Sequence, residues 1–370
     1  MKYQLSPTLR FSRIAPDRSL QIEIGRGDTR SRLSLDVDDP RAFYDWLLSM
    51  STAATSEDLV SSASKSLDFD EDSSTDLVSQ LISAGILIDT LEKQPNADLV
   101  ARWSEHGWRD AADFHLAYRG LAFLPDDDGG ATYRELFKGL LQNPGPVGDQ
   151  PQHYSPHATR RALAVAIEPL IETLTLEDVL TASRPANKFA GPAPGFEVIM
   201  AGLVDAVAAQ RVVGGSLGSH QQRSYPSGGA RHPFETYLVS KGITGLPLGA
   251  YWFDPLTHEL HPRDGAITPE SVDAACFGKG GVVSSKVCVV ITCRWLRHSW
   301  KYRYARSYRM LLLELGHMIQ SINFSMRARG VDIYQCPSIN DDDWLKLLDI
   351  DDDGREGPMY VIGLGQDGRI

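Results

Sequence analysis

The feature that most constrains the fold is a set of apolar runs in the C-terminal half of the chain. Residues 236–240 and 286–292 are short and rich in β-branched side chains, which is typical of buried strands. The stretch 304–329 instead carries apolar side chains at helical spacing, namely Leu311, Leu312, Leu315, Met318, Ile319 and Ile322. Further elements expected from the same periodicities are helices at 163–174 and 196–213 and a closing strand at 359–362. Because a helix with such a stripe needs a sheet to cover, we predict an α+β sandwich over residues 161–370.

Residues 1–95 follow a different pattern. The elements expected there, in order, are strands at 20–24 and 33–37, helices beginning at Pro40, Ser56 and Thr75, and a strand at 86–88. This order resembles a small winged-helix module. Its third helix carries Asp76 and neither Lys nor Arg, so contact with DNA phosphates would be repulsive. We therefore predict a peptide-recognition or docking domain, with a purely structural cap as the alternative.

Residues 96–160 separate these two regions. A helical segment is expected at 103–118, whereas the acidic, glycine-containing residues 126–130 and the Pro/Gly-rich residues 144–151 are typical of loops. We interpret 96–160 as a helical segment followed by a linker.

Composition excludes several classes of function. The 370 residues carry a net charge of −11, which argues against a nucleic-acid partner. The longest apolar stretch, residues 196–213, is interrupted by charged side chains, so no membrane span is expected. The N-terminus lacks the apolar core of a signal peptide, and the four cysteines suit a reduced, cytoplasmic protein.

No metal site is expected either. None of the cysteines has the C-x-x-C spacing of a zinc site. The acidic run 349–354 suggests a calcium loop, but the twelfth position from Asp349 is Tyr360, where such a loop needs a bidentate glutamate. These aspartates are therefore interpreted as solvated loop residues.

Two segments could hold an anionic or planar ligand. In Pro226-Ser227-Gly228-Gly229 the proline fixes the entry angle, and the glycines leave backbone amides accessible. Arg184 and Lys188 lie four residues apart after a predicted helix and could clamp a phosphate. Taken alone, each could also be an ordinary turn.

The basic and aromatic run 300–304 contains the adjacent pair Lys301-Tyr302. Burial and the neighbouring arginines would lower the pKa of Lys301, and the same positive field would favour ionisation of Tyr302. Because adjacent side chains of a strand point to opposite faces, both can serve one site only from a loop or a helix start. A surface cluster of cations stacked on aromatic rings is the alternative.

In this order, the motifs resemble those of the streptolysin-S-type azoline dehydrogenases of the nitroreductase-fold FMN family. The resemblance covers about residues 175–370. Its motifs are the segment Arg184 to Lys188, the turn Pro226 to Gly229 before Tyr237, the pair Lys301-Tyr302, the step Gly316-His317, and Gly363-Leu364-Gly365. It implies a nitroreductase-like sandwich preceded by the winged-helix-like domain.

The resemblance also implies a site. FMN would lie at a homodimer interface, held by Arg184, Lys188, Pro226, Ser227, Gly228, Gly229, Gly363 and Gly365. Lys301 and Tyr302 would be catalytic, removing a proton from a thiazoline or oxazoline ring while a hydride passes to the flavin. Ala186 and Lys188 replace a Ser and an Arg of the family pattern, which removes a hydroxyl and a bidentate fork from the phosphate site.

The substrate implied by the resemblance is a ribosomally synthesised precursor peptide, with a cyclodehydratase as a further partner. Two other functions stay open at this point. One is an NAD(P)H-dependent flavin reductase of dehydroamino acids or nitroaromatics on the same fold. The other is a flavin-free scaffold that binds the peptide and organises partner enzymes.

Overall fold

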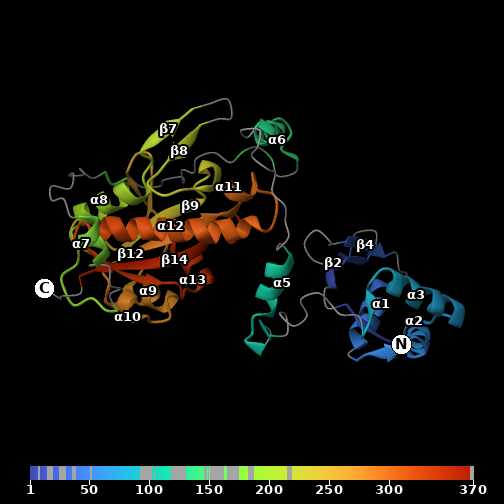
Figure 1. Cartoon of the computed structure of the whole chain (residues 1–370). Helices are drawn as coiled ribbons and strands as arrows, with labels where there is room; N and C mark the ends of the chain where they lie inside the picture. The colour runs from blue at the N-terminus through green and yellow to red at the C-terminus, as the bar shows by residue number, and fades with distance from the viewer. Residues whose placement is uncertain are drawn as a thin grey trace. The chain divides into compact units, whose positions relative to one another are not determined.

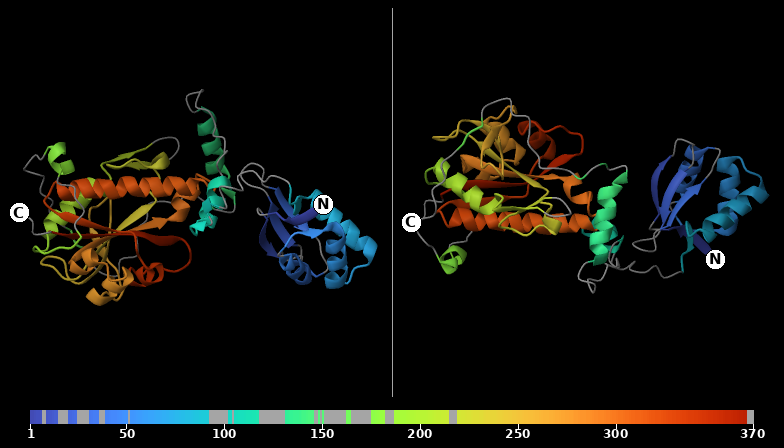
Figure 2. Two further views of the ribbon diagram at one scale, coloured as in Figure 1. Left: turned by 60° about the horizontal axis from the view of Figure 1, so that its bottom comes forward. Right: turned by 90° about the horizontal axis from the view of Figure 1, so that it is seen from above.

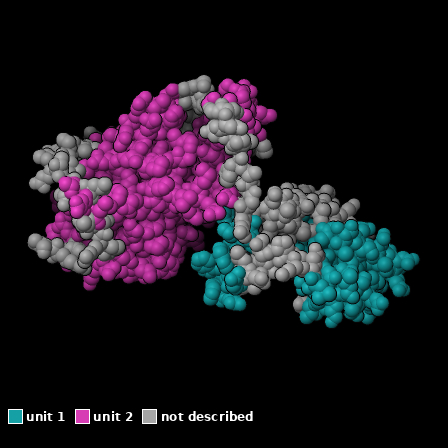
Figure 3. Space-filling model, viewed as in Figure 1, with its two compact units in different colours: residues 1–125 teal, residues 126–370 magenta. Residues whose placement is uncertain are grey.

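The structure is a computed structural model, and it describes residues 1–6, 9–14, 20–24, 31–35, 39–50, 52–91, 102–103, 105–117, 131–145, 148, 150, 162–164, 175–181, 187–214 and 219–366. The chain forms two compact units, Met1–Pro125 and Asp126–Ile370, each with its own hydrophobic core (Figure 3). The finer division into 1–95, 96–160 and 161–370 stays a prediction.

The first unit combines two small sheets with a group of helices. Its elements are β1 (Lys2–Leu5), β2 (Arg10–Ile14), β3 (Leu20–Ile24), β4 (Ser31–Leu35), α1 (Pro40–Ser49), β5 (Ala54–Thr55), α2 (Ser56–Leu67), α3 (Glu71–Ser83), β6 (Leu87–Asp89) and α5 (Arg109–Ala117). The sheet orders are β5-β1-β6 and β2-β3-β4. The predicted strands and helices of this region are therefore present, and the strands β1, β2 and β5 were missed.

Side-chain caps set the helix starts in this unit. Asp39 accepts hydrogen bonds from the first turn of α1, and Thr55 forms a capping box with Asp58 at α2. Asp70 caps α3, so this helix begins at Glu71 and not at Thr75 as expected. The apolar faces of the three helices pack around Trp46, Leu47, Leu59 and other core residues.

The second unit is built on a six-stranded antiparallel sheet in the order β11-β10-β9-β12-β14-β13. The six strands of this sheet are β9 (Phe234–Ser240), β10 (Gly249–Phe253), β11 (Leu260–Pro262), β12 (Val287–Arg294), β13 (Asp332–Cys336) and β14 (Glu356–Gly365). Two further strands, β7 (Arg211–Val213) and β8 (His220–Gln222), form a separate antiparallel pair. The helices of this unit are α6 (Ala131–Gln142), α7 (Leu176–Thr181), α8 (Phe196–Val207), the short 3-10 turn η3 (Gly228–Ala230), α9 (Pro269–Ala275), α10 (Gly280–Ser284), α11 (Trp295–Ser299), α12 (Ser307–Arg327) and α13 (Asp341–Leu347).

The central strand β12 shows how the layers arise. Its odd-numbered residues, such as Val289 and Ile291, join the core with α8 and α12. Its even-numbered residues, such as Cys288 and Val290, join the core with α9, α10 and α13. Since side chains alternate between the faces of a strand, helices cover both faces of the sheet, as Figures 1 and 2 show. The predicted α+β sandwich is confirmed.

Three expectations about this unit need correction. The apolar stretch 196–213 is not one helix, because α8 ends at Val207 and the β-branched end of the stretch forms β7. Leu312 is 48% exposed and lies outside the buried stripe of α12. Leu163 pairs with Leu260 in an antiparallel bridge and so does not begin a helix, while residues 165–174 lie outside the described part.

The remaining expectations concern membranes, metals and thiols. Within the described ranges no helix has the length and apolarity needed to cross a membrane. The same residues contain no group of His, Cys, Asp and Glu side chains arranged to hold a metal ion. All four cysteines are buried and free.

Candidate active site

The predicted pair Lys301-Tyr302 lies in the turn between α11 and α12. The backbone N–H groups of both residues donate to the carbonyl of His298, at 3.2 and 3.1 Å. This turn is irregular, so adjacent side chains can point into one site. The requirement that the pair avoid a regular strand is met.

The glycine turn lies directly against this pair. A Cβ atom added to Gly229 would lie 2.5 Å from the Lys301 Nζ and 2.8 Å from the Tyr302 hydroxyl oxygen. At Gly228 an added Cβ would lie 3.5 Å from the Tyr302 ring. The structure therefore brings the predicted turn and the predicted catalytic pair together, and any side chain at 229 would displace the Lys301 amine and the Tyr302 hydroxyl from these positions.

The backbone of the turn is unusual. Gly229 has a φ of 57°, and the non-glycine residues Ala230 and His232 have φ values of 52° and 42°. Left-handed conformations cost non-glycine residues about 1–2 kcal/mol each. Two hydrogen bonds offset this cost, from the Ala230 N–H to the Ser227 carbonyl at 3.0 Å and from the His232 N–H to the Ser227 Oγ at 2.8 Å. Strain retained in this way commonly marks a functional site.

Aromatic rings from α6 enclose the Lys301 amine. Its Nζ lies 4.5 Å from the centre of the Phe137 ring and 5.4 Å from that of Tyr133. Phe137 also packs edge-on against Trp300. Lys301 has neither a hydrogen bond nor an ion pair from its amine among the described residues. Burial lowers its pKa, and the positive charge of Arg231 acts in the same direction, as expected for a candidate base.

Tyr302 behaves differently from the expectation. Burial and the nearby Tyr133 raise the pKa of Tyr302 well above its usual value, and the opposing effect of Arg231 is smaller. The predicted easier ionisation of this phenol is therefore wrong, because the ring is more enclosed than a surface cluster would be. The His298 ring packs tilted against the Tyr302 ring, with 4.8 Å between their centres, and burial lowers the pKa of this imidazole to about 4. Tyr302 thus keeps its proton and faces a neutral imidazole.

Glu314 is a site residue that the sequence did not reveal. It lies on the buried face of α12, and its Oε2 accepts a hydrogen bond from the Gly228 N–H at 3.1 Å. Burial raises the pKa of Glu314 to about 7. The only sign of it in the sequence is that this glutamate lies three residues after Leu311, at a spacing that places it on the apolar face of the predicted helix.

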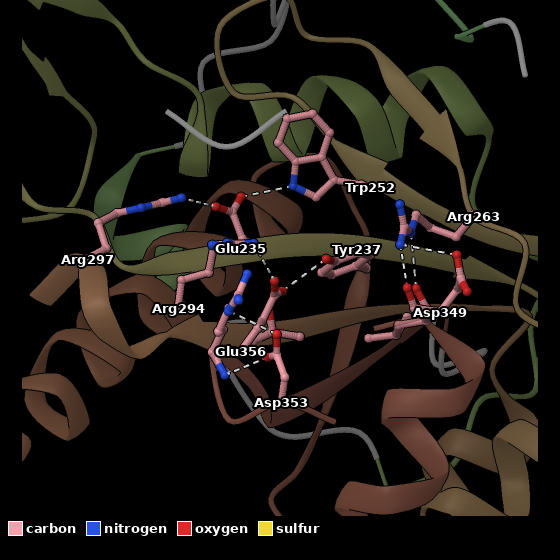
Figure 4. A network of polar contacts seen from close by, with 12 residues as sticks. Glu235, Tyr237, Trp252, Arg263, Arg294, Arg297, Asp349, Asp353 and Glu356 are labelled. Atoms are coloured by element: carbon pink, nitrogen blue, oxygen red, sulfur yellow. Dashed lines mark hydrogen bonds and ion pairs between the residues drawn. The ribbon is translucent and has the colours of Figure 1, made fainter. Parts of the chain in front are cut away.

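A buried polar network fixes the end of the sheet beneath this turn (Figure 4). Arg297 donates to the His232 carbonyl at 2.8 Å and forms an ion pair with Glu235, which also accepts from the Trp252 indole. In the second part of the network, Glu356 accepts from Tyr237, Thr292 and Arg294. These bonds connect α11, β9, β10, β12 and β14, and they hold the loop of His232 in place.

The other predicted cofactor residues lie elsewhere in the chain. Gly363 pairs with Cys288 near the start of β12, whereas Lys301 follows the end of that strand. A strand of this length spans about 23 Å. Lys188 is exposed beside Phe189, whose ring lies against Gly365. The cofactor residues therefore fall into two groups at opposite ends of the sheet, and Arg184 lies outside the described residues.

The comparison with protein families agrees with this architecture. A sequence model of the nitroreductase family matches residues 169–366, more than half of the chain. The chain belongs to the nitroreductase family. This membership indicates an oxidoreductase, and the match includes the turn, the pair Lys301-Tyr302 and Gly363-Leu364-Gly365. Helix α6, which covers Lys301, lies before the matched residues.

Individual relatives extend the comparison. The chain is 31% identical over 130 residues to the trifolitoxin-processing protein TfxB of Rhizobium leguminosarum bv. trifolii, a match that spans 34% of each protein. It is 20% identical over 325 residues to the trifolitoxin operon protein TfxC of the same organism, spanning 86% of this chain and 88% of TfxC. A solved structure of the E. coli microcin synthetase McbBCD complex, with truncated pro-MccB17 bound, contains a chain that is 20% identical, with a TM-score of 0.43, covering 76% of this chain and all of that one.

The residues at the turn fit the reactive edge of a flavin. The Gly229 N–H makes no hydrogen bond with any residue that the structure describes, so this donor is available to a ring nitrogen or carbonyl oxygen. The Lys301 amine and the Tyr302 phenol both lie against the same residue, Gly229. At the other end of the sheet, the exposed cation Lys188 suits a phosphate.

Proposed function

We propose that this nitroreductase-family protein is an FMN-dependent dehydrogenase that oxidises thiazoline or oxazoline rings of a peptide to azoles. The observation that carries the proposal is the convergence of Lys301 and Tyr302 on Gly229. Such an oxidation removes one proton and one hydride from adjacent ring atoms. A half-buried amine that has no hydrogen-bond or ion-pair partner among the described residues, beside a protonated phenol, suits the removal of that proton. The similarity to a trifolitoxin-processing protein supports a role in peptide maturation.

Lys301 would serve as the base. Its lowered pKa increases the fraction of neutral amine at neutral pH, and a positioned base typically contributes about 10²- to 10⁴-fold to a proton transfer. Tyr302 stays protonated and would donate a hydrogen bond to the heteroatom or carbonyl beside the ring. FMN, when bound, would accept the hydride. The aromatic wall of α6 would exclude water from the amine.

A homodimer would explain the two separated groups of cofactor residues. If two copies pack antiparallel about a two-fold axis, the turn of one protomer can reach Lys188, Gly363 and Gly365 of the other. Helix α12 offers a surface for such packing, because Leu312 and Leu313 are 48% and 66% exposed. We therefore propose that the flavin is bound between two copies of the chain. The first unit would recognise the precursor peptide or dock a cyclodehydratase.

The test uses the full chain reconstituted with FMN and a synthetic peptide that contains one thiazoline. Wild-type protein should show a flavin spectrum and lower the peptide mass by two hydrogens. Lys301→Ala should lose at least 100-fold in rate with flavin still bound. Lys301→Arg is the matched control, because it keeps the charge but cannot act as a base near neutral pH.

Full activity of Lys301→Ala would overturn the catalytic assignment. Rapid anaerobic bleaching of the flavin by NADPH, with the peptide unchanged, would indicate a reductase instead. Protein that stays colourless after reconstitution but binds peptide would indicate a scaffold.

A further inference from the structure

A small cavity lies beside the glycine turn, on the side of the β7–β8 hairpin. Its volume is about 150 Å³. Most of its polar lining comes from β8, from the segments on either side of η3, and from α11, and includes His220, Gln221, Arg223, Arg231, His232 and Arg297. Gln150 and Ser219 complete the polar lining. Such a volume holds a single small group, whereas whole cofactors occupy pockets of about 300–1,000 Å³.

The arginines of this cavity are incompletely neutralised. Arg297 is paired with Glu235. Among the residues that the structure describes, Arg223 donates only to neutral groups, the Gln221 side-chain oxygen and the Tyr225 hydroxyl. Arg231 donates through Nε to the Arg297 carbonyl at 2.8 Å, and its two Nη groups bond to none of the described residues. The described lining residues include no Asp or Glu.

Neighbouring titratable groups leave this charge in place at neutral pH. Burial and Arg297 lower the pKa of Arg231 to about 10, so the guanidinium stays charged. The pKa of His232 is lowered to about 3 by burial and by Arg223, so this ring is neutral. Glu314 lies within electrostatic range of Arg223 on the other side of the turn, and burial raises the pKa of Glu314 to about 7, so it carries only part of a negative charge. Two positive charges therefore face the cavity without a full counter-charge.

We propose that this cavity binds a carboxylate or a similar oxyanion, and that in the proposed reaction it takes the side chain of an aspartate or glutamate next to the ring being oxidised. Two guanidinium groups at one small cavity suit the planar, bidentate geometry of a carboxylate. The choice of a peptide as the carrier of this carboxylate rests on the proposed function, whereas anion binding itself does not.

The position of the cavity supports a role in orienting the substrate. Ala230 and Arg231 line it, and the preceding residue, Gly229, lies under the Lys301 amine. A side-chain carboxylate bound at Arg231 would hold the neighbouring ring of the peptide close to the Lys301 amine. Such positioning reduces the entropy that must be lost in reaching the transition state. The cavity is thus a specificity subsite next to the catalytic pair.

The experiment compares two synthetic thiazoline peptides that differ only by Asp or Asn at the residue beside the ring. Binding is measured by titration calorimetry and oxidation by steady-state kinetics, both with the flavin-loaded full chain. Wild-type protein should prefer the Asp peptide by at least tenfold, since a hydrogen bond to a charged group contributes about 1.5–3 kcal/mol. In Arg223→Gln and Arg223→Lys the ratio of the two affinities should fall toward one. Lysine keeps the charge, but it lacks the bidentate fork of arginine.

Arg211→Gln is the matched control, because this exposed arginine on β7 does not line the cavity but changes the net charge equally. It should keep the preference. Inorganic phosphate should compete with the Asp peptide in wild-type protein and not in Arg223→Gln.

The outcomes separate this inference from the proposed function. If neither peptide is oxidised but wild-type protein binds the Asp peptide more tightly and Arg223→Gln does not, the anion site stands and the proposed reaction fails. Equal binding of both peptides by wild-type protein overturns the anion site, even if both are oxidised. A loss of FMN affinity in Arg223→Gln with the peptide preference unchanged would assign the cavity to the flavin phosphate, and this too overturns the proposal.

Discussion

The two ends of the six-stranded sheet use glycine for opposite purposes. At the end of β12 near α11, Gly229 makes room for the reactive groups of Lys301 and Tyr302 in a strained turn. At the start of β12, Gly365 makes room for the apolar ring of Phe189 in an extended strand. The same residue type thus supports chemistry at one end and packing at the other. Substitutions at each end should therefore change different measurable quantities.

The largest effect is expected from Gly229→Ala. Its Cβ would occupy a position 2.5 Å from the Lys301 Nζ, so the amine must move away from the turn. A misplaced catalytic group can lose about 100-fold in rate. Stability should fall by only about 1–2 kcal/mol, the cost of a left-handed alanine. Peptide oxidation and urea unfolding measure the two quantities, and an unchanged rate would show that the amine does not act from this position.

Gly365→Ala is the counterpart at the other end. An added Cβ would lie 2.3 Å from Cγ of the buried Phe189 ring, and forcing extra atoms into a packed core costs about 1–3 kcal/mol. We expect a lower free energy of unfolding in the flavin-free protein. Exposed Lys188→Ala is the control, because it should leave that free energy unchanged and weaken only FMN binding. Normal stability of Gly365→Ala would mean that the Phe189 ring moves freely, and the contrast between the two ends would then fail.

The sequence predicted the parts of both ends that depend on local periodicity. Strands β9, β12 and β14 and the helix α12 could be predicted, because burial gives their apolar residues a spacing of two residues in a strand or 3.6 in a helix. The location of Lys301-Tyr302 on a turn also followed, since two adjacent side chains cannot otherwise serve one site. These inferences needed no knowledge of distant contacts.

Other features depended on contacts between distant segments, which no periodicity reports. Phe137 and Tyr133 reach Lys301 from a helix about 160 residues earlier in the chain. Their presence encloses the site, and this enclosure reversed the expected direction of the pKa shift of Tyr302. Glu314 was hidden in an apolar stripe for the same reason. Electrostatics at a buried site follow from which segments cover it, and the sequence of the site alone does not contain that information.

Phe137→Leu tests the covering helix at the reactive end. Replacing the ring by an aliphatic side chain of similar size removes a cation–π contact, which favours the charged amine by about 0.5–2 kcal/mol. The pKa of Lys301 should fall further, so the acidic limb of the pH dependence of kcat/KM should move to lower pH. Tyr133→Phe keeps its ring and should leave this limb in place. A shift toward higher pH in Phe137→Leu would mean that burial by this ring outweighs its attraction for the ammonium.

The smallest expected effect comes from Glu314→Gln, which probes the turn through its pH dependence. Burial raises the pKa of Glu314 from 4.5 to about 7, so the folded state binds its proton more tightly than the unfolded state. The favourable contribution of the neutral carboxyl is complete below pH 4.5 and is lost as pH rises to about 7. The wild-type Tm should therefore fall by a few degrees relative to Glu314→Gln between pH 5 and pH 7.5. The glutamine can still accept from the Gly228 N–H, so the turn itself is preserved. If the Tm of the two proteins changes with pH in the same way, Glu314 titrates normally. The end of the sheet that carries Gly229 would then be more open to solvent than the end that the Phe189 ring fills.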